Sequence, residues 1–570
     1  MKKSSLIILC IILIVILAGG TALFFVLSSK TGDSGNNLPG VNSPKVISEN
    51  EYSAMCISVT FGDDVNTTKN FCWQTFAKYS SGALQYFPIT EDTAGIDFDS
   101  AGSSKIITVS STSEETGIML PEENSSLKSP SLTEHSGLIH RVWLTDLTPG
   151  TKYMYRIGDT SENKWSSSAI FTVPLADSET SFLYITDAQG YTQSDYDIWG
   201  NLITAAAEKF PGAEFIMNLG DTVEENTNQN QWRMFFETPY DILRSSTFVS
   251  AAGNKDKKST MQHFTFGASD DRTSRVSGYY SFDYESIHFS VIYTGDNDKD
   301  LSDSQLKWLE QDLASSDAVW KIVLMHKSPV TNANHCNDVE ITALREQLLP
   351  VFDEYGVDVV IAGHDHYFFR SKPMTANGVS NYITDIKTSD GDPVVMYSRI
   401  SDGTFYFMNG SAGVKQHDGK LYEIDGVYPE DAYTTELPSY SYCTANENEI
   451  IFKTYTVSEN GESQLIDAWG LIREESETMQ ENAETLESIF VNCYKPEVCA
   501  ASFAKDLKSV GAGKIAEYTI TEEDEYVIIV VLTDEYNNKY AATLDAKTGF
   551  VGVIYENELG GKALYYMTDD

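Results

Sequence analysis

The stretch VDVVIAGHDH at residues 357–366 leads a short apolar run directly into two histidines that are separated by one residue. Three further stretches have the same design: FLYITDAQ at residues 182–189, EFIMNLGD at residues 214–221 and KIVLMH at residues 321–326. Apolar runs of this length are typical of short strands in a sheet that is covered on both faces. Because ligands of such α/β sheets bind outside the carboxyl ends of the strands, we expect the polar residues after these runs to share one site.

The polar residues at these ends, together with one asparagine, are the donors that a two-metal phosphoesterase site needs. Two metal ions about 3.5 to 4 Å apart neutralise an anionic phosphate ester and lower the pKa of a bound water. One carboxylate must bridge the ions, and further oxygen and nitrogen donors must surround them. Any one of these residues alone is more often a turn former, a helix cap or a satisfied polar group. The complete set, in this order, favours a metal centre: Asp187, Asp221, Asn254, His326, His364 and His366.

The order of the motifs resembles that of the calcineurin-like metallophosphoesterases, and specifically of their purple acid phosphatase branch. The motifs are Asp-x-x, Gly-Asp-x-x, Gly-Asn-x-Asp, a histidine after a Val-Leu-Met strand, and Gly-His-x-His. Residues 278–289 and 304–313 are similar to the catalytic domain of that branch, and residues 140–144 and 147–156 are similar to the end of its fibronectin-like N-terminal domain. The resemblance extends over roughly residues 48 to 475.

This resemblance implies a site for two metal ions, which could be Fe, Mn or Zn. One ion would be held by Asp187, Asp221 and His366, and the other by Asp221, Asn254, His326 and His364. Asp221 would bridge the two ions. A bound hydroxide would then attack phosphorus, while groups outside the metal shell stabilise charge and protonate the leaving alkoxide.

Three residues are expected to take part in catalysis without being ligands. His335 lies nine positions after His326 and matches one of the family's outer-sphere histidines. Lys255 and Asp256 directly follow the asparagine of the Gly-Asn-x-Asp motif.

Three departures from the family pattern bear on activity. Lys255 stands where the family has a histidine that contacts phosphate, and a lysine with its ordinary pKa near 10.4 is a poor proton donor at neutral pH. Glu224 stands three residues after Asp221, where purple members carry a tyrosine, so a purple chromophore is not expected. Gln189 replaces the usual glycine or histidine of the first motif. Gln189 or Glu224 could complete the shell of the first metal.

The N-terminus reads as a membrane anchor. Residues 6–27 are almost wholly apolar and long enough to cross a hydrocarbon core of about 30 Å as a helix. A cleaved signal peptide fits less well, because its apolar core is shorter and ends at a small-x-small site. Lys2 and Lys3 predict that residues 1–5 are a cytoplasmic tip, with the catalytic part outside the cytoplasm of a single-pass protein. The polar residues 28–46 are expected to form a flexible stalk.

Composition divides the rest of this multidomain chain into three parts. Residues 47–175 have short alternating runs between turn signals, which predicts an all-β fibronectin type III-like sandwich. Residues 176–473 alternate strands with amphipathic helices, such as those expected at 303–314 and 340–354, and so predict an α/β metallophosphoesterase sandwich. Residues 474–570 begin with a polar, helix-like stretch and continue with strands, as expected of a small α+β module that is faintly similar to PepSY-type domains.

Six cysteines lie outside the apolar N-terminal segment, and an even number permits disulfides in an outward-facing protein. Cys493 could pair with Cys499, and Cys56 could pair with Cys72. Free buried thiols are the alternative, because sequence does not determine connectivity. Histidines without motif support are expected to be structural: His135, His140, His263, His288 and His417.

The formal net charge of -43 bears on the partners of the protein. Such an acidic surface repels nucleic acid at long range, which argues against a DNA or RNA binder. A local metal pair outweighs diffuse surface charge at contact distance, so small phosphate esters remain plausible substrates.

The sequence therefore predicts a membrane-anchored phosphoesterase that hydrolyses small phosphate monoesters. Two alternatives stay open. The same site could serve a phosphodiesterase or a nucleotide pyrophosphatase. Alternatively, because Lys255 replaces the usual histidine, the chain could be a surface protein that binds metal and phosphate without turnover.

Overall fold

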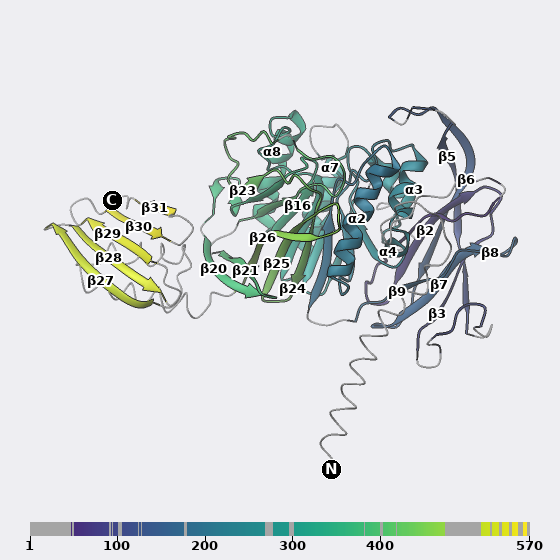
Figure 1. Cartoon of the computed structure of the whole chain (residues 1–570), viewed down its shortest axis with the longest axis horizontal. Helices are drawn as coiled ribbons and strands as arrows, with labels where there is room; N and C mark the ends of the chain where they lie inside the picture. The colour runs from purple at the N-terminus through teal and green to yellow at the C-terminus, as the bar shows by residue number, and fades with distance from the viewer. Residues whose placement is uncertain are drawn as a thin grey trace, which may run out of the picture. The chain divides into compact units, whose positions relative to one another are not determined.

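The computed structural model describes most of residues 47–473 and the strands between residues 515 and 566 (Figure 1). Short gaps in the first range fall at 48, 50, 91–92, 94, 101–104, 123–124, 127, 176–178, 268–277, 296–300, 381, 400–402 and 418. The predicted cytoplasmic tip, membrane segment and stalk, and also Cys493 and Cys499, lie outside the described residues. Among the residues that are described, no helix is both long and apolar enough to span a bilayer.

The N-terminal part is a β-sandwich, as the alternating sequence runs predict. One layer contains β1 (Met55–Phe61), β2 (Lys69–Phe76), β5 (Thr112–Pro121) and β6 (Leu132–Leu144). The other contains β3 (Gly82–Pro88), β4 (Ile107–Ser110), β7 (Lys152–Asp159), β8 (Lys164–Trp165) and β9 (Ala169–Thr172). Side chains from both layers meet in a buried aromatic core, where the ring of Phe71 lies 4.9 Å from Tyr155 and 5.3 Å from Phe171.

The following part is an α/β sandwich of two sheets. In the first sheet the strands are β10 (Thr180–Ile185), β11 (Phe215–Asn218), β12 (Thr247–Ser250), β20 (Tyr382–Ser389), β21 (Asp392–Arg399), β24 (Ser439–Ala445), β25 (Glu449–Val457) and β26 (Ser463–Ile472). In the second they are β13 (Tyr280–Tyr284), β14 (Ile287–Val291), β15 (Trp320–Lys327), β16 (Val359–Gly363), β17 (Phe368–Ser371), β22 (Phe405–Asn409) and β23 (Pro429–Tyr433). The ring of Phe182 in the first sheet lies 5.8 Å from Phe289 in the second, so the apolar runs meet between the layers.

Helices pack on these sheets, and the two helices expected from sequence are confirmed. The helices are α2 (Gln193–Lys209), α3 (Gln229–Glu237), α4 (Tyr240–Leu243), η1 (Lys257–Ser259), α5 (Thr260–His263), α7 (Asp303–Ser315) and α8 (Val339–Tyr355). Helix α2 packs on β24, β25 and β26, whereas α7 packs on β14 and α8 (Figure 1). The last helix ends where Gly356 adopts a positive φ of 66°, a conformation that glycine permits without a Cβ clash. A short hairpin pairs β18 (Met374–Thr375) with β19 (Gly378–Val379).

The two predicted domains share a sheet, which the sequence does not show. Strand β1 of the sandwich pairs in parallel with β12 of the α/β part, with Val59 opposite Thr247 and Thr60 opposite Phe248. A single sheet of twelve strands therefore runs from β20 through β10, β11 and β12 to β5. The sequence pattern gives the strands but not this pairing, because it depends on which edges meet in space.

The proposed pairing of Cys56 with Cys72 is wrong, because both thiols are free and buried. The register places Cys72 opposite Ser58, and the two sulfurs have different partners. Cys56 Sγ accepts a hydrogen bond from Gln229 Nε2 at 3.2 Å, whereas Cys72 Sγ donates to the carbonyl of Gln262 at 3.6 Å. Cys336 and Cys443 are also free and buried.

The C-terminal part is described as an antiparallel meander of five strands. These are β27 (Ile515–Asp524), β28 (Val527–Asp534), β29 (Lys539–Asp545), β30 (Phe550–Glu556) and β31 (Lys562–Tyr566). This agrees with the expected strands of the module. The helix-like stretch that precedes them in sequence lies outside the described residues.

Candidate metal centre

Each predicted ligand lies at or just after the carboxyl end of a central strand. Strands β10, β11 and β12 run parallel and lead to Asp187, Asp221 and Asn254. Strands β15 and β16 also run parallel; His326 lies near the end of β15, and His364 and His366 follow β16. Parallel strands bring these ends to one edge of each sheet, and that is why residues far apart in sequence converge.

The structure brings all six side chains into one cluster, in which Asp187, Asp221 and His326 are buried and the other three are partly buried. Asp221 Oδ1 lies 3.3 Å from His326 Nε2, which in turn lies 3.0 Å from Asn254 Oδ1. Ligand atoms of Asp221, His326 and His364 lie within 4.8 Å of one another, a spacing that suits one ion. On the other side of the cluster, Asp187 Oδ1 lies 3.3 Å from His366 Nε2.

The backbone is strained at four of these ligands. Asp187, Asp221, His364 and His366 have positive φ angles of 58°, 46°, 77° and 56°. Such angles are uncommon outside glycine and tend to cluster at functional sites. Gly220, at φ 93°, permits a close approach, because a Cβ there would lie 2.6 Å from the backbone nitrogen of Gly253. The strand ends thus hold the ligands at the cost of local strain.

The donor chemistry fits metal ions. Asp187 Oδ1 is buried, and apart from His366 Nε2 at 3.3 Å it has no polar partner among the described residues; a metal ion held by both side chains would satisfy it. Burial, followed by the charge of His326, holds the pKa of His364 well below its ordinary value, so its neutral imidazole can act as a ligand. Burial alone would lower the pKa of His326, but the charge of Asp221 raises it to about 9. Carboxylates, imidazoles and an amide in one pocket are the ligand types of Fe, Mn or Zn sites.

The predicted outer residues take different positions. His335 lines the pocket, with its ring 4.3 Å from that of His364 and its Nδ1 2.7 Å from Asp338 Oδ2. Asp256, in contrast, is buried and accepts hydrogen bonds from the backbone nitrogens of Gly253 and Thr222, at 2.6 and 3.0 Å. Asp256 therefore joins two ligand-bearing loops instead of lining the pocket, and we assign it a positioning role.

Gln189 and Glu224, the two possible extra ligands, differ in orientation. The amide of Gln189 is best satisfied when its nitrogen donates to the carbonyl oxygens of Asp187 and Asp221, at 3.0 and 2.9 Å. This turns its oxygen toward the pocket. Glu224 instead binds two lysines: its Oε1 lies 3.2 Å from Lys255 Nζ, and its Oε2 accepts a hydrogen bond from Lys415. Burial would raise the pKa of Glu224, but the Lys415 hydrogen bond and the charges of both lysines outweigh it, so that the pKa is lowered.

Sequence reasoning missed one wall of the pocket. Lys415, Gln416 and His417 follow β22 and line the same cavity of about 360 Å³ as the ligands. His417 was expected to be purely structural, yet it faces this cavity, and its backbone nitrogen donates to the carbonyl of His366 at 3.1 Å. The only available signal was the Asn-Gly-Ser-Ala-Gly turn at residues 409–413 after an apolar strand, and this turn carries no metal-ligand side chain that would draw attention to it.

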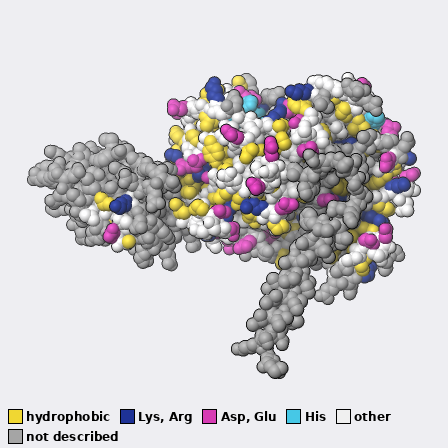
Figure 2. Space-filling view, in the orientation of Figure 1, with side chains coloured by type: hydrophobic (Ala, Val, Ile, Leu, Met, Phe, Trp, Pro, Cys, Tyr) yellow, Lys and Arg dark blue, Asp and Glu magenta, His cyan; other side chains and the backbone are white. Residues whose placement is uncertain are grey.

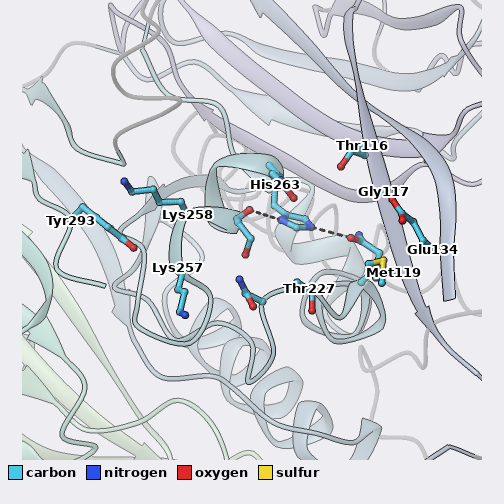
Figure 3. Close-up of a pocket in the computed structure, with 13 residues that line it drawn as sticks. Thr116, Gly117, Met119, Glu134, Thr227, Lys257, Lys258, His263 and Tyr293 are labelled. Atoms are coloured by element: carbon cyan, nitrogen blue, oxygen red, sulfur yellow. Dashed lines mark hydrogen bonds between the residues drawn. The ribbon is translucent and has the colours of Figure 1, made fainter. Parts of the chain in front are cut away.

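A second, polar cleft of about 570 Å³ lies beside the loop that follows Asn254 (Figure 3). Lys257, Lys258 and Tyr293 line one side of it, whereas Thr116 and Glu134 of the sandwich strands line the other. His263 also lines this cleft, and its ring nitrogens are hydrogen-bonded to the carbonyl of Ser259 and to Oε1 of Gln229 (Figure 3). The loop of residues 253–259 thus contributes Lys255 to the metal pocket and two further lysines to this cleft.

Comparisons with known proteins agree with this geometry. Residues 55–173 match the family described as "Purple acid Phosphatase, N-terminal domain", and residues 180–368 match "Calcineurin-like phosphoesterase". Purple acid phosphatase 23 of Arabidopsis thaliana is 26% identical over 284 residues, which cover 44% of this chain and 60% of that protein. An uncharacterized Mycobacterium tuberculosis protein is 24% identical over 361 residues, which cover 57% of this chain and 66% of that protein. The chain therefore spans less than two thirds of the length of these curated relatives.

A purple acid phosphatase from yellow lupin seeds has the same fold, with a TM-score of 0.58. It is 17% identical in sequence, and the match covers 74% of this chain and 75% of the lupin chain. At this identity the likeness concerns the fold alone.

Proposed function

Because this chain belongs to the purple acid phosphatase-like branch of the calcineurin-like metallophosphoesterases, we propose that it is a metal-dependent hydrolase of small phosphate monoesters. One observation carries the proposal. Six donor side chains from the ends of five separate strands meet in one largely buried cluster around Asp221.

The residues of the pocket have separate proposed roles in hydrolysis, and the first of these is metal binding. Asp187, Asp221, Asn254, His326, His364 and His366 would hold the metal pair, with the Gln189 oxygen as a further donor. When bound, the metal pair neutralises the phosphate and supplies an activated hydroxide. Asp221 is suited to bridging, because its Oδ1 already lies between His326 Nε2 and the backbone nitrogen of Lys255, at 3.3 and 2.7 Å.

His335 is placed to move a proton. Asp338 holds its Nδ1 at 2.7 Å, which leaves Nε2 as the nitrogen that can serve a leaving-group oxygen. Its side chain is 42% exposed, so a proton can be exchanged with solvent after each turnover. Lys255 supplies positive charge where the family has a histidine.

We also propose that the chain is anchored by residues 6–27, with the phosphoesterase outside the cytoplasm. The length of this apolar segment and the two lysines before it support the proposal. Cleavage of protease-accessible sites in intact cells or right-side-out vesicles tests it. Protection of the catalytic part from added protease would contradict the proposed orientation.

The experiment for the activity uses the purified protein loaded with Mn²⁺, Zn²⁺ or iron and assayed on aryl phosphate mono- and diesters. We expect turnover of the monoester and its loss, together with loss of bound metal, in Asp221→Ala. Faster hydrolysis of the diester or of a nucleoside triphosphate would favour the diesterase or pyrophosphatase alternative.

A second candidate function is favoured by Lys255, namely binding of metal and phosphate without turnover. Metal binding and phosphate binding with no hydrolysis of any ester would support this candidate. Gain of hydrolysis in Lys255→His would then identify the lysine as the cause.

A further inference from the structure

Glu224 lies at the centre of a charged cluster on the wall of the metal pocket. Its side chain is 8% exposed and accepts hydrogen bonds from Lys415 Nζ and, at 3.0 Å, from the hydroxyl of Tyr191. Lys255 Nζ lies 3.2 Å from the same carboxylate. Glu224, Lys255 and Lys415 come from three loops, which follow β11, β12 and β22. We call Lys255, Glu224 and Lys415 the lysine clamp.

The lysine clamp presents surplus positive charge to the pocket. Two ammonium groups carry six N–H donors between them, and one carboxylate cannot satisfy them all. Lys255 and Lys415 both line the cavity that contains the metal ligands, and their side chains are 39% and 32% exposed. Glu224 therefore fixes both ammonium groups, while their remaining donors are available to a ligand.

The clamp is also close to the position where phosphate would bind. The backbone nitrogen of Lys255 donates to Asp221 Oδ1 at 2.7 Å, so this lysine adjoins the proposed bridging ligand. The protein as a whole is strongly acidic, with a net charge of -43. A local excess of cations in such a chain needs a local reason, and an anionic ligand provides one.

We propose that the lysine clamp is a specificity-determining element that selects phosphoryl groups carrying two negative charges over those carrying one. This inference rests on the proposed function, because it concerns the same pocket. A phosphate monoester has a second pKa near 6 and is close to dianionic above pH 7, whereas a diester carries one charge. Charge-assisted hydrogen bonds from the ammonium groups favour the extra anionic oxygen of the monoester.

The test uses Lys415→Met in the full-length protein, with two independent readouts. The first is kcat/KM for an aryl phosphate monoester and for the matching diester. We expect a fall of about 10- to 30-fold for the monoester and less than about 3-fold for the diester. The second is the affinity for inorganic phosphate, measured by calorimetry, which should fall about 10-fold at unchanged metal content.

Lys387→Met is the matched control. Lys387 is 44% exposed and pairs with Glu449 on a different strand, so it resembles Lys415 in exposure and partner but does not line the pocket. We expect no change in either readout. Lys415→Arg should restore most of the monoester preference, because it keeps the charge and the bond to Glu224.

Glu224→Gln tests whether the monoester preference depends on the fixed positions of the two ammonium groups or only on their charge. It makes the pocket more positive, yet we expect the preference for the monoester to fall, because the two ammonium groups lose their common partner. A larger preference for the monoester in Glu224→Gln would overturn the proposed role of the lysine clamp. So would equal losses for monoester and diester in Lys415→Met, or an unchanged phosphate affinity. If the wild-type protein hydrolyses neither ester, the proposed function fails, whereas the phosphate measurement still decides for or against the clamp.

Discussion

His335 is the residue whose proposed role is most readily separated from metal binding. It lines the pocket, yet its Nδ1 is held by Asp338. His335→Ala should lower kcat for a monoester by about 10²- to 10³-fold, because proton transfer to the leaving group is lost. Metal content should stay near that of the wild type, as measured by plasma emission spectrometry.

A leaving group that needs no proton provides the control for His335. A nitrophenyl ester should lose less activity in His335→Ala than an alkyl phosphate does. Equal losses of rate and bound metal would show that His335 acts by holding the ligands.

Single residues are most predictable where they carry a motif. The six side chains predicted as ligands lie close together, and five of them stand at the ends of apolar runs that are visible in the sequence. The run before Asn254 was not predicted, and the role of all six as ligands stays a prediction. Lys415 and His417 were not predicted, since they follow β22 in a turn with no recognisable ligand pattern. The motif predicts a catalytic role for Asp256, whereas its hydrogen bonds from the backbones of Gly253 and Thr222 favour a positioning role.

At the scale of elements, His288 ties two strands to a helix. Its Nδ1 lies 2.7 Å from Asp283 of β13, and its Nε2 lies 3.0 Å from Asp312 of α7. Burial alone would lower the pKa of His288, but the hydrogen bonds to the two carboxylates raise it to about 9. The ordinary pKa of histidine is 6.5, so the unfolded chain releases this proton above about pH 6.5. The folded protein keeps the proton on His288 until about pH 9.

The sign of the His288 effect follows from this linkage. Its contribution to the free energy of unfolding is fully present below about pH 6.5 and is lost as the pH rises through about 9. We expect this loss to be roughly 1 to 2 kcal/mol, since Asp283 is largely exposed and its charge is screened. Urea denaturation at pH 6.5 and pH 9.5 measures it.

His288→Gln should remove most of that pH dependence. The exposed pair of His135 and Glu49, whose atoms lie 2.6 Å apart, offers a control, because His135→Gln should leave the pH profile almost unchanged. A profile that is the same in the wild type and in His288→Gln would contradict the proposed role of the histidine.

Elements were the most predictable part of the fold. Strands β10, β11, β15 and β16 and helices α7 and α8 agree with the apolar runs and the amphipathic periods within a few residues. Helix α2 carries its own start signal, since Thr192 and Asp195 form a capping box. Pairing between β1 and β12 has no such local signal, and so it was not predicted.

At the scale of the whole molecule, Lys69 lies buried where the sandwich joins the α/β part. Its Nζ donates to Thr247 Oγ1 of β12 at 2.9 Å and lies 4.2 Å from the ring centre of Phe61. Burial lowers the pKa of Lys69 to about 7. The unfolded chain therefore binds more protons than the folded protein between about pH 7 and 10.5, and stability from this group rises with pH across that window.

Lys69→Met should stabilise the protein at pH 6 by about 1 to 3 kcal/mol, because it removes the cost of burying an ammonium group while keeping the volume. The gain should shrink as the pH approaches 10. Thermal unfolding at both pH values measures it. Destabilisation by the same amount at every pH would show that the bond to Thr247 outweighs the burial cost.

The acidic surface predicts that kcat/KM for an anionic substrate rises as salt is added. Asp and Glu side chains are spread over the face seen in Figure 2, and the whole chain carries a net charge of -43. This field repels an anionic ester before it reaches the pocket, so screening should speed its approach. We expect kcat/KM for a phosphate monoester to rise by about 2- to 5-fold between 10 and 150 mM NaCl, measured at fixed metal loading. A fall over this range would show that attraction by the pocket dominates at long range.

The strand pairing between Val59 and Thr247 makes the boundary near residue 175 a poor place to divide the polypeptide. A fragment that began there would leave β12, whose four residues are all buried, as an open edge facing water. Open apolar edges recruit other chains, so the isolated catalytic fragment would be prone to aggregate. The sandwich thus covers the edge of the strand that leads to Asn254, and a fragment for study should retain both parts.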